Sequence, residues 1–270
     1  MKKITAAAVT VAAIVSLLAG CGLIDGSKVI EAEPSHEARE TVRVTLREGL
    51  TLEQMFEILE RERVASAEDL WEIAENYDFE HEFLEDAPPV GERLRLEGFL
   101  FPDTMDYFVD EHPESVIRRM LNNFSNRFTP DMRGQAAEMG YSVRDIVIIA
   151  SLIEREAAVD DDRPLIASVI YNRLASPDFP RLDIDATILY AMAITGEPFS
   201  VNLDSPYNTR RYPGMPPGPI GNPGLRSIRA ALEPADTDYY FYALRHDRSH
   251  HFTRTYDEHR AFVRSPEYGG

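Results

Sequence analysis

The sequence predicts an α+β protein in which helices predominate. Residues 42–46 alternate between apolar and polar side chains, as expected of a half-buried strand. Between residues 113 and 232 the apolar residues mostly recur at helical spacing. Residues 239–244 and 251–255 have the composition of two strands on either side of a polar turn, which predicts a β-hairpin near the C-terminus.

Composition excludes several classes of protein. The chain has 270 residues, with 28 basic and 46 acidic side chains and a formal charge of −18. This length suits one or two folded units. The acidic balance argues against binding nucleic acid or docking electrostatically on anionic lipid. A single Cys excludes an intramolecular disulfide framework and a Cys-based zinc site.

The N-terminus has the pattern of a secretory signal. A basic start precedes an apolar run over residues 4–18, which is short for a membrane span, and small residues then precede Cys21. This arrangement resembles a bacterial lipobox, in which the Cys is acylated. We therefore predict a signal peptide over 1–20, a flexible tether over 21–40 from lipidated Cys21, and a location on the extracytoplasmic face of the cytoplasmic membrane. The alternative is a single uncleaved N-terminal transmembrane anchor.

The predicted strand at 42–46 is followed by two amphipathic helices. Thr51 and Ser66 each begin a helix with the pattern of a capping box. Residues 93–96 alternate again, which predicts a second strand. A strand–helix–helix–strand unit over 41–96 resembles the LysM fold, a glycan-binding module, and a spacer domain is the alternative.

The second predicted domain covers 97–265 and is mainly helical. Its helices are expected at 113–128, 130–139, 142–158, 164–175, 185–194, 224–232 and 256–264. Residues 205–224 hold six of the 18 prolines and four of the 15 glycines, which predicts a long ordered loop. This loop is a candidate wall for a binding cleft.

The segment 145–157 is the most informative stretch of the sequence. Apolar side chains point in nearly every direction around this predicted helix, so it should be buried. Glu154 and Glu156 follow near its end and point about 160° apart, so both cannot act on one bond from this helix. Apolar surroundings disfavour the charged form of a carboxyl group, which suits it to general acid catalysis. The alternative is a solvated carboxylate or a pair with Arg155.

Seven short motifs follow one another along the chain. They are LEGFLFPDT (96–104), ASLIERE (150–156), VIYNRL (169–174), LDIDATILY (182–190), SPYNT (205–209), PGMPPGPIGNPG (213–224) and HFT (251–253). Their order and spacing resemble the MltG (YceG-like) family of endolytic murein transglycosylases. The resemblance extends over about residues 41–262 and implies that the second domain is a lysozyme-like transglycosylase catalytic domain.

The resemblance also implies a reaction. Such an enzyme cleaves the β-1,4 bond between N-acetylmuramic acid and N-acetylglucosamine within peptidoglycan strands, and the muramic C6 hydroxyl attacks its own C1 to leave a 1,6-anhydro end. Ordinary glycosidases need two carboxyl groups, whereas this reaction needs one, first as acid and then as base. The resemblance assigns that role to Glu154, so Glu154→Gln should abolish activity and Glu156→Gln should retain more.

Six residues of the motifs are predicted to bind sugar. Aromatic side chains can stack on pyranose rings, and the polar ones can bond hydroxyl and acetamido groups. The predicted ligands are Tyr171, Asn172, Asp185, Tyr207, Asn208 and Thr209. Asp185 is also a candidate N-cap of its helix, and Tyr190 is expected to pack in the core. Arg210 departs from the family, which usually has Tyr there, so aromatic stacking at this position is in doubt.

No metal or cofactor is predicted. The spacing of His246, His250, His251 and His259 matches no standard metal site, and the run Asp160–Asp162 is better explained by a helix N-terminus. The expected partners are peptidoglycan strands, the membrane through the anchor and, from the resemblance, peptidoglycan synthases, with no nucleic acid. Two alternatives remain open: a non-catalytic peptidoglycan-binding lipoprotein and a lysozyme-type muramidase that uses water.

Overall fold

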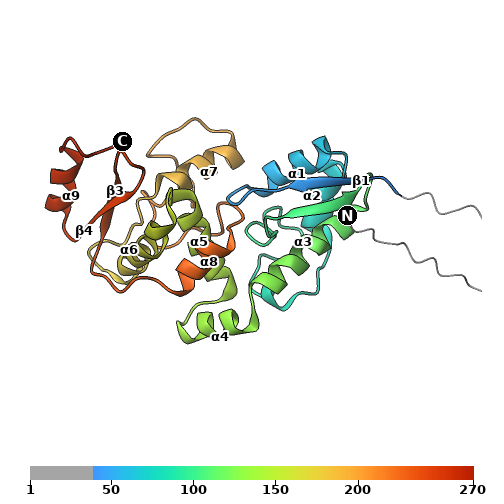
Figure 1. Ribbon diagram of the computed structural model, residues 1–270, viewed down its shortest axis with the longest axis horizontal. Coiled ribbons are helices and arrows are strands. Elements are labelled where there is room, and N and C mark those ends of the chain that lie inside the picture. Colours follow the sequence, from blue (N-terminus) through green and yellow to red (C-terminus); the bar gives the residue numbers. More distant parts are fainter. Residues whose placement is uncertain (1–38) are drawn as a thin grey trace, which may run out of the picture. The chain divides into compact units, whose positions relative to one another are not determined.

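Two antiparallel strands precede and follow the first helices of the described chain in the sequence. The computed structural model describes residues 39–270 (Figure 1). Strand β1 (Thr41–Thr45) pairs over its whole length with β2 (Thr104–Phe108). Helices α1 (Leu52–Arg61) and α2 (Ala67–Asn76) lie between them in the sequence, followed by the short 3₁₀ helix η1 (Glu82–Leu84). The predicted first strand and the two helices after it are confirmed, whereas the second strand lies outside the predicted 41–96 unit.

Side-chain caps fix the starts of the first two helices. The Thr51 hydroxyl accepts from the Gln54 amide at 3.3 Å, and the Gln54 side chain accepts from the Thr51 amide at 3.1 Å. The Ser66 hydroxyl accepts from the Asp69 amide at 3.1 Å. Both caps are at the predicted residues, and such caps each contribute about 1 kcal/mol to stability.

The predicted strand at 93–96 is wrong. These residues form consecutive turns, in which the Glu97 amide donates to the Leu94 carbonyl at 3.1 Å. Arg95 is buried and its guanidinium donates to the Tyr77 carbonyl at 2.9 Å, so the apparent alternation does not separate an inner from an outer face. The partner of β1 is β2 instead, in a segment for which the sequence predicted no strand.

Contacts cross the predicted division between 41–96 and 97–265. Both β2 and helix α3 (Pro113–Arg127) follow residue 97, yet β2 pairs with β1 and α3 packs on α2. The division itself stays a prediction.

The other predicted helices are present with small shifts at their ends. They are α4 (Pro130–Glu138), α5 (Val143–Glu156), α6 (Arg163–Ala175), α7 (Asp185–Thr195), α8 (Leu225–Leu232) and α9 (Tyr256–Val263), with the short 3₁₀ helix η2 (Asp160–Asp162) before α6. Strands β3 (Phe241–Leu244) and β4 (His250–Thr253) form the predicted hairpin. The α+β class with mostly helical content is therefore confirmed.

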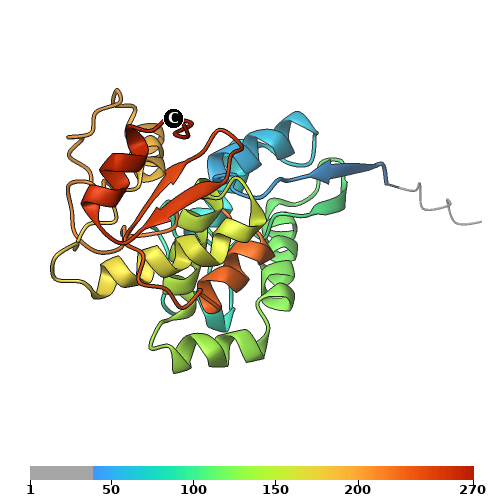
Figure 2. The same cartoon turned by 60° about the vertical axis from the view of Figure 1, so that its left-hand side comes forward.

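Helix α5 lies at the centre of this second group of helices. Every residue from Ile146 to Ile153 is buried, as the all-round apolar pattern predicts. Helices α6, α7 and α8 each contact α5, and Figure 2 shows α6 and α8 beside it. The neighbours of α5 therefore determine what its C-terminal side chains meet.

The proline-rich loop over 205–224 packs inward. Its residues Asn208, Thr209 and Asn222 are fully buried or nearly so. Gly98 has φ +89°, and a Cβ there would lie 2.6 Å from Pro219 and Val147, so only glycine fits between the loop and α5. This close approach joins the first motif to the loop.

Glu97 is a buried carboxyl group at the same junction. It accepts from the Leu52 amide at 3.1 Å, the Tyr190 hydroxyl at 3.0 Å and the Asn222 side chain at 3.0 Å. Burial raises the pKa of Glu97 to about 8, although these neutral donors partly oppose the shift. Tyr190 is in the core, as predicted, and is 4% exposed.

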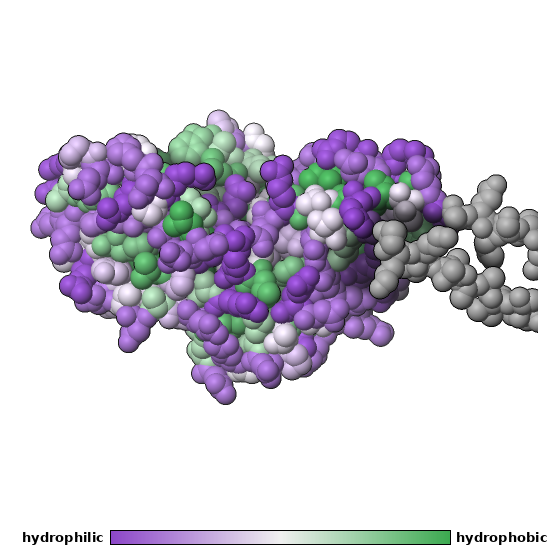
Figure 3. Space-filling view, viewed as in Figure 1, coloured by the Kyte–Doolittle hydropathy of each residue, from purple (hydrophilic) through white to green (hydrophobic). Residues whose placement is uncertain are grey.

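Hydrophilic residues cover most of the face in Figure 3, and apolar residues gather over α7, where Leu189 and Ile194 are exposed. Within residues 39–270, no helix is both long and apolar enough to cross a membrane. The predicted signal peptide, Cys21 and nearly all of the tether lie outside the described residues, so these stay predictions.

Glu97 predicts a dependence of stability on pH. Its pKa of about 8 in the folded protein exceeds the ordinary value of 4.5, so the folded state holds a proton that the unfolded state releases. This stability is fully present below about pH 4.5 and is lost as the pH rises toward about 8. We expect Glu97→Gln to flatten the fall of Tm across that range, measured by circular dichroism. An unchanged slope in the variant would contradict this assignment.

Candidate active site

A cavity of about 600 Å³ opens where α5 ends. Its lining comes from α5, α6, the segment before α7, the proline-rich loop, the β3–β4 hairpin and α9, and includes Glu156, Asp183, Asp185, Arg210, Tyr242 and His250. Ligand sites commonly have this size, and polar groups that converge in such a cavity mark a candidate site. The lining joins residues that are up to about a hundred positions apart.

Glu156 is the last residue of α5 and lies in this cavity. The Tyr242 hydroxyl donates to its carboxylate at 2.9 Å. Burial raises the pKa of Glu156, while the Tyr242 hydrogen bond and the nearby His250 act in the opposite direction. Glu156 therefore keeps its proton to a higher pH than an ordinary carboxyl group, as a general acid requires.

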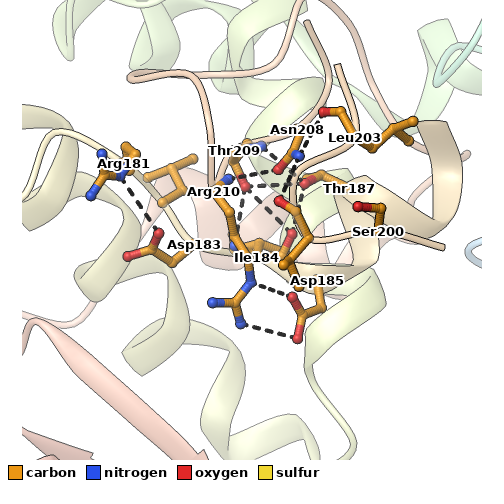
Figure 4. A network of polar contacts seen from close by, with 12 residues as sticks. Arg181, Asp183, Ile184, Asp185, Thr187, Ser200, Leu203, Asn208, Thr209 and Arg210 are labelled. Carbon is orange, nitrogen blue, oxygen red and sulfur yellow. Dashed lines mark hydrogen bonds and ion pairs between the residues drawn. The ribbon is translucent and has the colours of Figure 1, made fainter. Parts of the chain in front are cut away.

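The two other carboxylates of the cavity are each paired with arginine. Arg210 donates to both oxygens of Asp185, and Figure 4 shows this paired arrangement. Arg173 donates to Asp183 at 2.8 Å. Among the cavity carboxylates, Glu156 alone has no ion pair with another described residue.

Glu154 lies outside the cavity lining. One carboxylate oxygen accepts from the Gly224 amide at 3.0 Å and the Ser227 hydroxyl at 2.8 Å, at the start of α8. The other accepts from Arg163 at 3.3 Å, and both of these charged side chains are 8% exposed. The expectation of apolar surroundings is wrong for Glu154, because α6 and α8 supply polar groups that its own helix does not show.

Two of the predicted sugar ligands tie α6 to other segments. The Tyr171 hydroxyl donates to the Ala231 carbonyl at 2.7 Å. The Asn172 side chain donates to the carbonyls of Thr237 and Tyr239, each at 2.9 Å. Neither residue lines the cavity.

The SPYNT motif has a similar structural use. The Asn208 side chain donates to the Leu203 carbonyl at 2.9 Å, and the Thr209 hydroxyl accepts from the Ile184 amide at 3.1 Å (Figure 4). The Tyr207 ring packs 5.0 Å from that of Tyr190. These three residues also lie outside the cavity lining.

Of the six predicted ligands, only Asp185 lines the cavity. It is not the N-cap of α7, because Ile184 holds that position without a side-chain cap. The sequence reasoning missed Arg210, Tyr242 and His250 as cavity residues. Arg210 could have been singled out because it departs from the family pattern. Nothing in the sequence around Tyr242 or His250 indicates that these residues line a cavity.

The histidines of the C-terminal region have separate partners. His250 bonds Asp162 at 2.8 Å, and His251 bonds Arg245 at 2.7 Å. In the described part of the chain, no group of three or more His, Cys, Asp or Glu side chains could hold a metal ion.

Comparison with known proteins identifies the family. The model of the YceG-like family matches residues 23–265. The chain belongs to the YceG-like family. A YceG-like protein from Listeria monocytogenes, solved by crystallography at 2.6 Å, has a TM-score of 0.71 and 30% identity, over 82% of this chain and 75% of that one. The predicted family resemblance is thus confirmed.

Curated relatives of this YceG-like chain have a named activity. It is 38% identical over 168 residues to the endolytic murein transglycosylase of Bacillus subtilis (strain 168), which covers 61% of this chain and 46% of that protein. It is 36% identical over 160 residues to the enzyme of that name from Streptococcus pneumoniae serotype 2, covering 56% and 28% respectively. The matched regions thus span less than half of the length of these relatives.

The contacts of Glu154 predict a structural role. Glu154→Gln leaves the buried Arg163 with the exposed Asp160, at 3.2 Å, as its remaining charged partner, and breaking a buried ion pair costs up to about 3–5 kcal/mol. We expect urea denaturation to show that the free energy of unfolding falls by up to this amount. Adding Arg163→Met should recover part of it, because no unpaired charge then remains. Equal stability of the wild type and Glu154→Gln would refute this role.

Proposed function

We propose that this protein is an endolytic murein transglycosylase, the activity that the names of its curated relatives state. The observation that carries the proposal is Glu156, which has a raised pKa, no arginine partner among the described residues and a place in the cavity. A reaction that uses one carboxyl group as acid and then as base needs such a residue.

The proposed reaction takes place at C1 of the muramic sugar. Glu156 donates its proton to the glycosidic oxygen as the bond from that oxygen to muramic C1 breaks. The Glu156 carboxylate then takes the proton of the C6 hydroxyl, whose oxygen bonds to C1 and closes the 1,6-anhydro ring. Attack within one sugar benefits from a high effective concentration, and acid–base help of this kind contributes about 10²–10⁴-fold.

The proposal gives this role to Glu156 in place of Glu154, which the family resemblance suggested. The assignment to Glu154 stays untested by the comparisons. The geometry favours Glu156, because both oxygens of Glu154 accept from α8 or Arg163, outside the cavity. Glu154 is then a positioning residue that holds the end of α5 against α6 and α8.

A lysozyme-type muramidase is the second candidate. It would need another carboxylate to activate water or to form a covalent intermediate. Asp185 lies in the cavity, but Arg210 engages both of its oxygens. This ion pair favours the transglycosylase.

The proposal also covers the N-terminal parts of the protein. The β1–α1–α2–β2 order supports a LysM-like module that binds glycan beside a lysozyme-like catalytic domain. The lipobox-like sequence supports an anchor at Cys21 that holds the enzyme at the membrane. Peptidoglycan synthases would then act on the same strands.

Substitution of the two glutamates separates the two roles. We expect residues 22–270 to release anhydromuramyl ends from uncrosslinked peptidoglycan, and Glu156→Gln to lose nearly all of this activity, at least about 10²-fold. Glu154→Gln should retain more activity per folded molecule. Mass spectrometry of the products provides the measurement. Full activity in Glu156→Gln would overturn the assignment, and reducing ends would indicate a muramidase.

The pH profile tests the contact with Tyr242. The Tyr242 hydroxyl stabilises the charged form of Glu156, so Tyr242→Phe should raise the pKa of Glu156 further. The alkaline limb of kcat/KM, where the acid loses its proton, should then move to higher pH. A limb that stays in place or moves to lower pH would show that Glu156 does not supply the proton.

A further inference from the structure

The cavity has more positive than negative side chains in a strongly acidic protein. Four arginines and three carboxylates line it, whereas the whole chain has 46 acidic and 28 basic residues. The sugar rings of peptidoglycan are uncharged at the scissile bond. An excess of arginine beside that bond therefore indicates a negative group elsewhere on the substrate.

Two of the four arginines are already engaged. Arg173 is paired with Asp183, and Arg210 with Asp185. Arg155 has one long contact, 3.4 Å to the Gly49 carbonyl. The Arg248 side chain has no hydrogen bond or ion pair with any other residue in the range 39–270. When Glu156 is protonated, the charges of Arg155 and Arg248 are uncompensated within the cavity.

The backbone at Arg248 is held in an unusual conformation. Its φ is +72°, in the left-handed region that favours glycine or asparagine. The β3–β4 turn fixes it there: the Arg245 amide donates to the Ser249 carbonyl at 2.8 Å, and Asp247 accepts from Ser249. A large cation at a position that costs backbone energy points to a use for the side chain.

We propose that Arg155 and Arg248 form a subsite for the carboxylates of the peptide stem carried by the muramic sugar. The inference rests on the proposed function. The stem is attached to the sugar ring whose C1 is attacked, so a carboxylate of the stem lies within the same region as Glu156. Arginine binds carboxylates through paired, charge-assisted hydrogen bonds. The subsite selects strands that carry charged stems.

The test compares two substrates that differ only in charge. These are uncrosslinked strands with native stems and the same strands with the stem carboxyl groups converted to primary amides. For the wild type we expect KM for anhydro-end release to rise about tenfold on the amidated strands, with kcat nearly unchanged. Added salt should raise KM on the native strands only.

Variants locate the effect at the two arginines. Arg248→Asn suits the left-handed backbone and removes the charge, so it should raise KM about tenfold on native strands and little on amidated ones. Arg155→Gln should act in the same way, and Arg248→Lys, which keeps the charge but loses the paired donors, should retain part of the affinity. Arg43→Gln, at an exposed side chain of β1, is the control and should match the wild type on both substrates.

The same KM on both substrates in the wild type would overturn the subsite, as would equal KM increases on both in Arg248→Asn. If the wild type releases no anhydro ends, the proposed function fails instead. Calorimetric titration of native and amidated strands into the wild type and Arg248→Asn then still tests the subsite. Tighter binding of native than of amidated strands, lost in Arg248→Asn, supports the subsite. Equal affinity for the two kinds of strand, or an affinity that Arg248→Asn does not change, refutes it.

Discussion

The burial of α5 on all sides is the constraint on which the C-terminal half of the molecule depends. A helix without a polar face must be enclosed, and α6, α7, α8 and the proline-rich loop enclose this one. The segment before α3 also takes part in this enclosure, because Gly98 packs against both Val147 and Pro219. Glu97 and Asn222 then join the start of α1 to the same loop. The segments that carry the family motifs thus share one core.

This enclosure gives two glutamates, two residues apart, different surroundings. Glu154 meets α8 and Arg163, which satisfy both of its oxygens. Glu156 emerges into the cavity, where one hydroxyl contacts it and burial raises its pKa. When two neighbouring carboxyl groups have different surroundings, their pKa values can differ, so that one can act in acid–base chemistry while the other has another role. The difference arises from the neighbours and not from the helix.

Charge is distributed unevenly over the protein. The chain as a whole is acidic, while the cavity gathers arginines from α5, α6, the loop and the hairpin. Two of these pair with aspartates of the cavity, and the other two are those of the proposed carboxylate subsite. Under the proposed function, this combination of aromatic, acid and cationic groups would serve a neutral glycan with charged peptide stems.

The sequence alone determined most of the helices, their caps at Thr51 and Ser66, the buried state of α5 and the family. These properties depend on local pattern, since caps and periodicity involve residues a few positions apart. Tertiary structure decided the partner of β1, the structural use of Tyr171, Asn172, Asn208 and Thr209, and which glutamate reaches the cavity. A motif shows which residues are present, but the groups that occupy their polar atoms come from distant segments. Arg163, Ser227 and Tyr242 are such groups, and only the folded chain brings them to the end of α5.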